Sequence, residues 1–495
     1  MLDQSFSPDN FKTIIQILNR KGIYIEGEGK FTRDVFLPSR REANKLLSIN
    51  QTIKSERERL IINAKRNSTK FDYGSYKFFK DAFSDLKTKI RKVKDEKLEE
   101  VLNELSELVN KESYKVGFNR GHIKWGKQLY VDNGTAEDFL VLKQIQYNLK
   151  KSFKVKPSSR SLILPQLITL LEDKFSKTVI RTDISSFYEN IDHGLLISKI
   201  GNNNVLSSPS KRIIKQVLNA YWQTLIADGL KLSTDIRVGI PRGFGISAYL
   251  AEVFMREFDS RIRALPNVTY YARYVDDIII IITPNSRHET ISPNSYIDRV
   301  EKILDEEVKL SLNLEKTKVL DLRPVASKLT SISTLQMTFL GYIFIFKYRH
   351  VDNDISNPIS LQNVVVRMSR ERKKRYAKRI INAFKIYDRG RTVFLKKSNR
   401  LLIRRIKYLT SNTKLIGNKS KAFVGVYFSN IFLTEDYDDL IFLDKLLSIE
   451  INKLPASTSY LKARLTKFKF KKGFKTKIFY NYNLKTLDLI LNNWD

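Results

Sequence analysis

The sequence predicts an α+β fold in which helices pack on an antiparallel sheet, and three patterns carry this prediction. Thr178–Asp183 is rich in β-branched residues and favours a buried strand. Tyr270–Tyr274 and Ile278–Ile282 are apolar runs on either side of a short polar segment, which is typical of a hairpin. Leu250–Ile262 and Ile297–Val308 repeat apolar residues at helical spacing. Strand-like runs beside amphipathic helices indicate one mixed domain.

The region before this mixed domain is predicted to be helical. Its best example is Asp95–Ser113, where leucines and a valine recur at three- and four-residue steps with acidic residues between them. We therefore divide the chain into a helical N-terminal extension at 1–135, an α+β domain at 136–345 and a C-terminal domain at 346–495.

The C-terminal domain is predicted to be basic and mainly helical. From Gly341 to Asp495 the chain has 33 Lys and Arg against 12 Asp and Glu, a net charge of +21. Arg370–Arg379 and Lys467–Lys477 interleave basic and aromatic residues, and Leu440–Ile451 has helical spacing. Basic and aromatic residues together suit contacts with the phosphates and bases of nucleic acid. The alternative is a basic surface that is merely solvated.

The composition of the whole chain points to a polyanionic partner. Its 88 basic and 53 acidic residues give a net charge of +35, far above the charge that solubility alone requires. The chain has no cysteine, which excludes disulfides and thiolate zinc sites. We find neither a secretory signal pattern nor an apolar run of about 18–20 residues that could span a membrane. We expect a cytoplasmic protein with no membrane partner.

Three acidic residues suggest a metal site. Asp183 ends the first predicted strand, and Asp276 and Asp277 lie between the two arms of the predicted hairpin. Carboxylates between apolar strands are costly to desolvate without a cation. If they converge, they can hold two Mg²⁺ ions, with Mn²⁺ as the alternative, because oxygen ligands suit these metals. The other interpretation is that Asp276 and Asp277 form a solvent-facing turn.

The residues around these acids resemble the motifs of reverse transcriptases, and the motifs occur in the family order. Each motif alone is weak or moderate, whereas the ordered set is specific. The matching segments are Asp183–His193, Gly239–Gly243 with Ser247, Tyr274–Asp277, Leu312–Lys318 and Phe339–Tyr342. The resemblance covers roughly residues 150–345 and implies the fingers and palm of a right-hand polymerase. It also implies that the N-terminal extension contributes to the fingers and that the C-terminal domain is thumb-like.

The resemblance also implies roles for single residues. Asp183 and Asp276 would bind both metal ions with Asp277 in support, and Ile184 would offer its backbone carbonyl to the nucleotide metal. Tyr188 falls where the family has an aromatic sugar gate, which would exclude the 2′-hydroxyl of ribonucleotides. The alternative is that Tyr188 is a core aromatic residue.

Further roles follow from the other motifs. Lys316 would neutralise or protonate the departing pyrophosphate, although an isolated lysine is more often solvent-facing. Arg242 and Gly243 would lie beside the incoming nucleotide, and Arg160 is our candidate for a basic nucleotide contact from the fingers. The primer-grip turn would consist of Phe339, Leu340, Gly341 and Tyr342.

Two neighbouring features depart from the family pattern. Most relatives have a neutral amide where this chain has Arg242, and a proline-containing segment where it has Phe244–Ser247. This departure places ordinary copying of long RNA templates in question.

The motifs look closest to those of defence-associated and abortive-infection reverse transcriptases of bacteria. The resemblance implies antiviral defence, a structured non-coding RNA as template, dNTPs as substrates and DNA as product. It leaves open a homo-oligomer and a protein hydroxyl as primer. The alternatives are a retron or group II intron enzyme, a template-independent polymerase, and a non-catalytic RNA-binding scaffold with a polymerase fold.

Overall fold

The computed structural model describes most of the chain. Its described residues are 2–21, 25, 35–124, 126–173, 175–201, 205–285, 292–322, 335–350, 359–414, 423–434 and 436–492, with the backbone alone for 348–350, 359–362, 484 and 485. These residues form two compact units, of which the first comprises 1–156 and 188–254 and the second comprises 157–187 and 255–495. The division of the chain into three domains at 135 and 345 stays a prediction.

The first unit is mainly helical and contains one small hairpin. Its N-terminal part consists of α1 (Pro8–Arg20), α2 (Leu37–Arg66), α3 (Tyr73–Ala82) and α4 (Ser84–Asn110). The hairpin β1 (Asn119–Lys124) and β2 (Lys127–Val131) follows. The remaining helices are α5 (Ala136–Ser152), most of α7 (Phe187–Asn190), α8 (His193–Gly201), α9 (Ser208–Ala227) and α10 (Ser247–Phe254).

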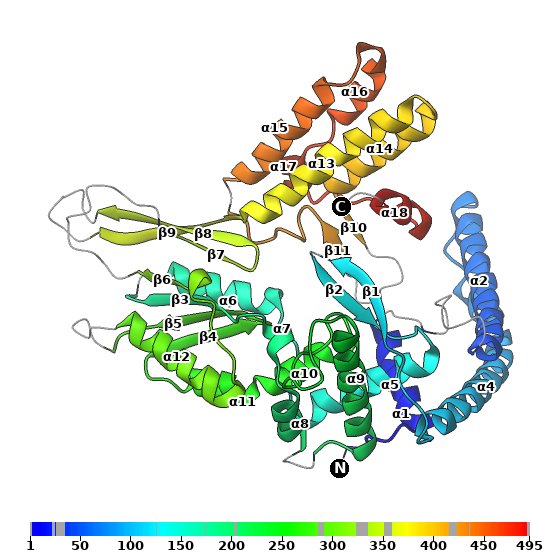
Figure 1. The fold of residues 1–495 in the computed structure, drawn as a ribbon. Coiled ribbons are helices and arrows are strands. Elements are labelled where there is room, and N and C mark those ends of the chain that lie inside the picture. Colours follow the sequence, from blue (N-terminus) through cyan, green and yellow to red (C-terminus); the bar gives the residue numbers. More distant parts are fainter. Residues whose placement is uncertain are drawn as a thin grey trace. The chain divides into compact units, whose positions relative to one another are not determined.

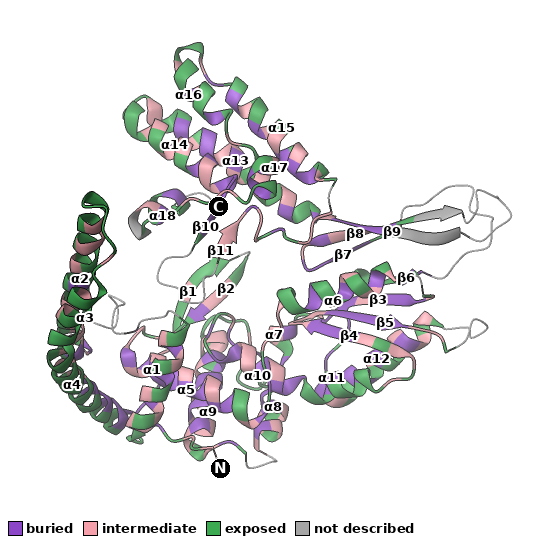
Figure 2. Ribbon diagram, turned by 180° about the vertical axis from the view of Figure 1, so that it is seen from behind, coloured by how far each residue is buried: buried purple, intermediate pink, exposed green. Residues whose placement is uncertain are grey.

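Helices α2 and α4 lie side by side for much of their length (Figure 1). The predicted helix at Asp95–Ser113 is the second half of α4, which ends at Asn110. Its buried face consists of the predicted apolar positions, apart from Leu108, together with Ser106 and Val109. Most other residues of α2 and α4 are exposed, as Figure 2 shows in green.

The second unit is built on a four-stranded antiparallel sheet with the strand order β4-β5-β3-β6. The strands are β3 (Thr178–Asp183), β4 (Val268–Tyr274), β5 (Asp277–Ile282) and β6 (Lys318–Asp321). The helices α6 (Arg160–Glu172), α11 (Arg256–Arg263) and α12 (Pro293–Val308) lie beside it (Figure 1). The predicted strand and hairpin are confirmed.

Alternation along the central strands divides the sheet into two faces. Val179, Ile279 and Ile281 point to one face, where they join a core with apolar residues of α6, such as Leu167. The same core includes residues of a second sheet, which has the order β7 (Leu335–Phe339), β8 (Tyr342–His350) and β9 (Ile359–Met368). Val179, Ile279 and Ile281 are all buried, so packing fixes the sheet next to the end that carries Asp183 and Asp277.

The C-terminal part of the second unit is mainly helical, as predicted. It consists of α13 (Arg370–Arg391), α14 (Leu395–Leu409), the short strands β10 (Asn412–Lys414) and β11 (Phe423–Gly425), α15 (Asp438–Asn452), α16 (Ser459–Leu465), α17 (Phe470–Lys475) and α18 (Leu484–Leu491). These helices enclose a separate apolar core that includes Phe384, Ile406, Leu443 and Phe470.

One predicted helix is wrong in its continuity. Leu250–Ile262 was expected to be a single helix, but α10 ends at Phe254 and α11 begins at Arg256. Met255 between them has φ −88° and ψ −2° and is fully buried. Apolar spacing continues through this position, so periodicity alone could not locate the break. Within the described residues, no helix is long and apolar enough to cross a membrane.

Close packing in the C-terminal helices makes one glycine necessary. A Cβ atom at Gly473 would lie 1.7 Å from the carbonyl oxygen of Thr410. Gly473→Ala should therefore force the backbone apart and lower the free energy of unfolding by about 1–3 kcal/mol or more. A fall in the midpoint of thermal unfolding would confirm this expectation. Gly201→Ala is the control, because its Cβ would meet nothing within 4 Å, and an equal effect of both changes would contradict the packing argument.

Candidate active site

The strand register brings the predicted acidic residues to one end of the central sheet. In the antiparallel pairing of β3 with β5, Asp183 is the direct partner of Asp277. Directly opposed residues point to the same face, with Cβ atoms typically about 4.5–5.5 Å apart. On the other side of β5, Asp277 pairs with Tyr274, so that Val275 and Asp276 form the two-residue turn between the strands. The structure thus brings Asp183, Asp276 and Asp277 together.

The turn that presents Asp276 has a strained backbone. Val275 adopts a φ of +63°, in the left-handed region that β-branched residues rarely occupy. Such a conformation costs on the order of 1–3 kcal/mol and persists only where surrounding contacts hold it. Two hydrogen bonds do so here. The Arg273 guanidinium donates to the carbonyl oxygen of Val275 at 2.9 Å, and the Ile184 amide donates to that of Asp276 at 3.1 Å.

Arg273 is itself held by a buried ion pair. Its Nε and Nη2 atoms donate to the two carboxylate oxygens of Asp259 in α11 at 2.8 and 2.7 Å. The hydroxyl of Tyr271 donates to the same carboxylate at 2.6 Å. Arg273 is only 4% exposed and Asp259 only 8%. Breaking such a pair typically costs about 3–5 kcal/mol, so this network can fix the turn in place.

The segment after α12 delivers a lysine to the carboxylates. The backbone amide of Asn313 donates to the carbonyl oxygen of Asp183 at 2.7 Å, which aligns this segment with the end of β3. The Asn313 side chain accepts a hydrogen bond from the Lys316 amide at 3.3 Å and caps the short helical turn Leu314–Lys316. The Lys316 Nζ atom then lies 2.6 Å from Oδ2 of Asp183. Its side chain is 55% exposed, so it remains accessible to a substrate.

A second cation, Arg181, was missed by the sequence analysis. Its Nη2 atom donates to Oδ1 of Asp277 at 2.5 Å, and its Nη1 atom donates to the carbonyl oxygen of Lys316 at 3.2 Å. Arg181 precedes Asp183 by two residues on a strand, so the two side chains share a face. That alternation was visible in the sequence, but the contact with Asp277 depends on the register.

The donor set at this end of the sheet fits a divalent metal ion. It consists of oxygen atoms from Asp183, Asp276 and Asp277, with the carbonyl of Ile184 adjacent in the chain, and oxygen donors suit Mg²⁺ and Mn²⁺. The carboxylates of Asp183 and Asp277 each attract a protein cation. Within the described residues, no three His, Cys, Asp or Glu side chains form a ready metal cluster. Substrate phosphates would therefore have to supply further ligands.

The predicted gate, Tyr188, lies in the first unit, in a cluster of charged side chains. Arg242 forms two hydrogen bonds to the Glu189 carboxylate, from Nε at 2.9 Å and from Nη2 at 2.8 Å. The Arg242 guanidinium also lies over the ring of Tyr188, with Cζ 4.9 Å from the ring centroid. Lys127 from β2 adds a second ion pair to Glu189 at 3.1 Å. The charge of Arg242, which departs from the family pattern, is therefore offset within the protein.

The glycine-containing segment Gly239–Gly243 packs against the residues around Tyr188. The Ile240 amide donates to the carbonyl oxygen of Tyr188 at 2.8 Å. Gly239 has a φ of +98°, and a Cβ atom there would lie 2.9 Å from the ring of Tyr221. Gly243 has a φ of +83° and lines a cavity of about 380 Å³ together with residues of α5, such as Gln146. These glycines thus permit a close approach of backbone segments.

The predicted primer-grip turn is a tight hairpin in the second unit. Phe339 pairs with Tyr342 across the turn, and Leu340 and Gly341 both have positive φ, at +47° and +82°. Two positive φ values are typical of a type I′ turn, for which glycine is well suited. Arg372 of α13 lies over the Tyr342 ring at 4.1 Å, and a Cβ atom at Gly341 would approach its Nη2 atom to 2.8 Å. The turn is therefore anchored to the C-terminal helices.

Arg160, the basic residue predicted to contact the nucleotide, begins α6 in the second unit. Its Cζ atom lies 5.1 Å from the centroid of the Tyr274 ring, just before the Asp276–Asp277 turn. It lines a cavity of about 370 Å³ with three arginines of α13, namely Arg372, Arg375 and Arg379. The structure thus places Arg160 beside the acidic turn and beside other guanidinium groups, an environment that favours phosphate.

Comparison with known proteins agrees with this geometry. Residues 139–344 match the family model described as reverse transcriptase (RNA-dependent DNA polymerase). No curated protein matches the chain. The family match confirms the predicted α+β class with fingers and palm.

Two solved structures with similarity to the chain are yeast telomerases. Apo telomerase from Candida tropicalis, truncated from its C-terminal domain, is 13% identical over 53% of this chain and 68% of that chain, with a TM-score of 0.30. Telomerase from Candida albicans in complex with the TWJ fragment of telomeric RNA is 11% identical over 78% of this chain and 66% of that chain, with a TM-score of 0.32. The chain thus spans about two thirds of their length, and likenesses this remote support no conclusion about its activity.

The Glu189–Arg242 pair should make stability depend on pH. Burial alone would raise the pKa of Glu189, but the hydrogen bonds and charge of Arg242, together with the hydrogen bond of Lys127, outweigh it and lower this pKa from 4.5 to about 2. A lowered carboxyl pKa stabilises the fold above the unfolded value, and this contribution is lost as the pH falls from about 4.5 towards 2. Glu189→Gln should remove it. The unfolding free energies of wild type and variant should therefore converge over this range, and a constant difference between them would refute the assignment.

Proposed function

We propose that the chain copies a structured non-coding RNA into DNA for bacterial antiviral defence. The premise is that residues 139–344 form a reverse transcriptase domain and that the chain is an RNA-directed DNA polymerase. The observation that carries the catalytic part is the pairing of Asp183 with Asp277 beside the Asp276 turn. The defence role and the non-coding RNA are supported by the form of the motifs around Asp183, Gly239 and Tyr274. The cytoplasm is the proposed location.

The acidic cluster would hold two Mg²⁺ ions, with Asp183 and Asp276 as shared ligands and Asp277 in support. Ile184 would add its backbone carbonyl. When bound, such ions activate the primer 3′-hydroxyl and offset the charge that develops on the leaving pyrophosphate. The turn around Val275 supports this assignment, because Arg273 holds the turn that carries Asp276 beside Asp183 and Asp277.

Lys316 and Arg181 would exchange partners when substrate binds. Each cation contacts one carboxylate of the cluster, Asp183 or Asp277, in the structure. Binding of divalent cations to the same carboxylates would weaken these ion pairs. Lys316, which is partly exposed, would then be free to donate a proton or a hydrogen bond to the departing pyrophosphate.

Tyr188 would select deoxynucleotides by filling the space that a ribose 2′-hydroxyl needs. We assign to Arg242 the role of positioning this ring, in addition to the nucleotide contact predicted from the sequence. Its guanidinium lies over the Tyr188 ring while Glu189 fixes it from the other direction with two hydrogen bonds. A bidentate pair restricts the guanidinium more than a single contact would, so the ring above it has fewer conformers. Gly243 would allow close approach of the backbone to the nucleotide.

The primer end would be held by the hairpin of Phe339, Leu340, Gly341 and Tyr342. The stacking of Arg372 on Tyr342 supports this role, because it keeps the turn rigid. Arg160 would contact a phosphate near the same carboxylates. A homo-oligomer is compatible with this proposal.

Substitution of the acidic residues tests the catalytic proposal. Asp183→Asn and Asp276→Asn should each lower DNA synthesis on an RNA template by roughly a hundredfold or more, because a lost metal ligand costs several kcal/mol of transition-state stabilisation. Incorporation of labelled dNTPs with Mg²⁺ or Mn²⁺ measures the effect, and RNA binding should be retained. Asp305→Asn on the exposed side of α12 is the control. Unchanged synthesis by both site variants would favour the scaffold interpretation.

Sugar selection tests Tyr188 and Arg242 together. Tyr188→Ala should reduce the preference for dNTPs over NTPs, within the range of about 10- to 200-fold that steric pockets provide. Arg242→Gln should reduce it less, and Arg242→Lys should restore little, because lysine cannot form the bidentate pair. The readout is the ratio of kcat/KM for the two substrates, which a general loss of stability would not change. If Arg242→Gln lowers activity for both substrates equally, the positioning role is wrong.

A further inference from the structure

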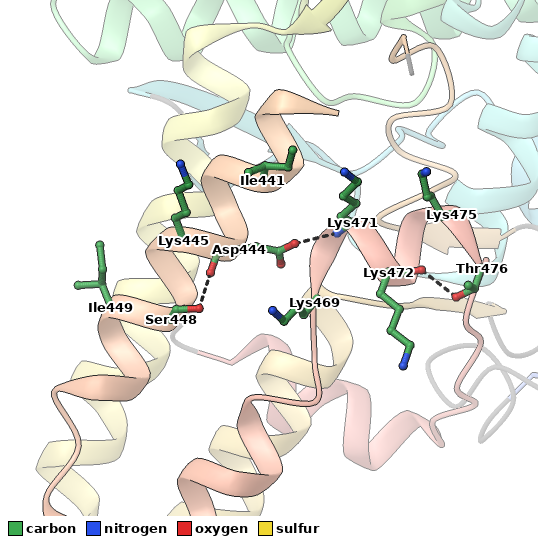
Figure 3. Close-up of a pocket in the computed structure, with 10 residues that line it drawn as sticks. All are labelled: Ile441, Asp444, Lys445, Ser448, Ile449, Lys469, Lys471, Lys472, Lys475 and Thr476. Atoms are coloured by element: carbon green, nitrogen blue, oxygen red, sulfur yellow. Dashed lines mark hydrogen bonds between the residues drawn. The ribbon is translucent and has the colours of Figure 1, made fainter. Parts of the chain in front are cut away.

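A large cavity among the described residues lies in the C-terminal helices, and none of its lining residues belongs to an element that supplies the acidic cluster. Its volume is about 830 Å³, and it lies between α15 and α17. Five lysines line it, together with Ile441, Asp444, Ser448, Ile449 and Thr476 (Figure 3). The lysines are Lys445 of α15, Lys469, and Lys471, Lys472 and Lys475 of α17.

A second cavity of about 410 Å³ continues this basic surface. Lys469 and Lys472 line both cavities, and Lys407, Arg464 and Lys467 add further cations to the second. Figure 3 shows the side chains of Lys445, Lys471 and Lys475 pointing in one direction and that of Lys472 in the opposite one. We call the surface of the two cavities the lysine groove. Its cations come from α14, α15, α16, α17 and the segment before α17.

The positive charge of the lysine groove is offset only to a small extent by acidic side chains. Asp444 is the one acidic residue among those lining the two cavities. Its carboxylate accepts hydrogen bonds from the backbone amides of Phe470 and Lys471 at 2.6 and 3.2 Å, so it fixes the start of α17. Within the described part of the chain, no ion pair engages a cation of the groove. This contrasts with Lys316 and Arg181, which both contact carboxylates.

Cations that form no ion pairs and lie along a groove suit a ligand that carries several regularly spaced anions. Like charges held close together repel each other, and a polyanion removes this cost while releasing its own counterions. A small anion would meet only one or two of the lysines. The phosphates of a nucleic acid backbone, which repeat along a strand, match the extended groove better.

The aromatic residues of the groove indicate which form of nucleic acid fits. Single strands bind mainly by stacking their bases on exposed aromatic rings. Of the residues lining the two cavities, only Phe468 and Tyr480 are aromatic. Phe468 is half-buried, and the ring of Tyr480 lies under the Lys407 ammonium group, 3.4 Å from the centroid. One exposed ring, Tyr460, lies next to the groove, under Arg464. The residues that line the groove therefore offer many more phosphate contacts than stacking surfaces, which suits a base-paired helix.

We propose that the lysine groove docks a base-paired stem of RNA through its phosphates, as a binding surface separate from the polymerase site. The choice of RNA over DNA rests on the proposed function, in which a folded RNA is the template. The groove would hold the stem of that RNA while its single-stranded part reaches the acidic cluster. Binding at the groove itself requires none of the residues assigned to catalysis.

The triple variant Lys445→Gln, Lys472→Gln and Lys475→Gln tests this proposal in the full-length chain. All three side chains are exposed, so the fold should be retained, which thermal unfolding will check. The affinity for an RNA hairpin with a stem of about 20 base pairs should fall. The slope of log affinity against log salt should decrease by roughly two to three, close to one for each lost phosphate contact. Binding of single-stranded RNA of equal length should change little.

A charge-matched control separates the groove from general electrostatics. Lys54→Gln, Lys89→Gln and Lys92→Gln remove the same charge from exposed positions on α2 and α4. The proposal is overturned if this control loses as much stem affinity as the groove variant. It is also overturned if single-stranded RNA loses as much as the stem. An equal loss for a DNA duplex would overturn the assignment to RNA.

Different assays test the lysine groove and the proposed polymerase function, so the two proposals can be refuted separately. On a short RNA template that has no internal stem and is paired only to its DNA primer, the groove variant should synthesise DNA at the wild-type rate, whereas Asp276→Asn should not. If the wild-type protein makes no DNA from any RNA template, the proposed function is wrong. Groove-dependent binding of the RNA stem would still stand in that case, because it is measured without catalysis.

Discussion

The pairing of β3 with β5 is the constraint on which the rest of the site depends. It sets Asp183 opposite Asp277 and places Asp276 in the turn beside them, so negative charge gathers at one end of an otherwise apolar sheet. A shift of the register by one residue would turn Asp183 to the other face. The buried isoleucines of β5 oppose such a shift, because they pack on the core below the site. The same core that stabilises the unit thus maintains its chemistry.

Charge compensation explains most of the polar contacts that surround this pairing. Arg273 and Asp259 neutralise each other in the interior and hold the strained turn at Val275. Lys316 and Arg181 approach the carboxylates from the accessible side. In the other unit, Glu189 offsets Arg242 in the same manner. The unusual Arg242 in the Gly239–Gly243 motif is therefore not an uncompensated charge, and it is compatible with an active polymerase.

Features formed by residues close together in the sequence were predicted well, whereas contacts between residues far apart in the sequence were missed. Thr178–Asp183 and the following hairpin were predicted closely, because β-branched runs and a short polar turn are local signals. The break at Met255 was missed, since apolar spacing continues across it. Convergence of the three acids was inferred from motif resemblance and not from spacing. Arg181, Asp259 and Glu189 were missed as partners because their contacts join residues 14 to 96 positions apart, and only the folded register brings them together.

The excess of positive charge in this chain therefore has two different structural settings. At the acidic cluster the cations are paired, and their partners are the groups expected to bind metal, so a substrate must compete with contacts that already exist. At the lysine groove the cations form no ion pair among the described residues, so a polyanion gains most of their attraction. A paired cation can respond to the arrival of substrate by changing partners. An unpaired row can bind strongly but cannot switch, and this difference suits the first setting to catalysis and the second to holding a template.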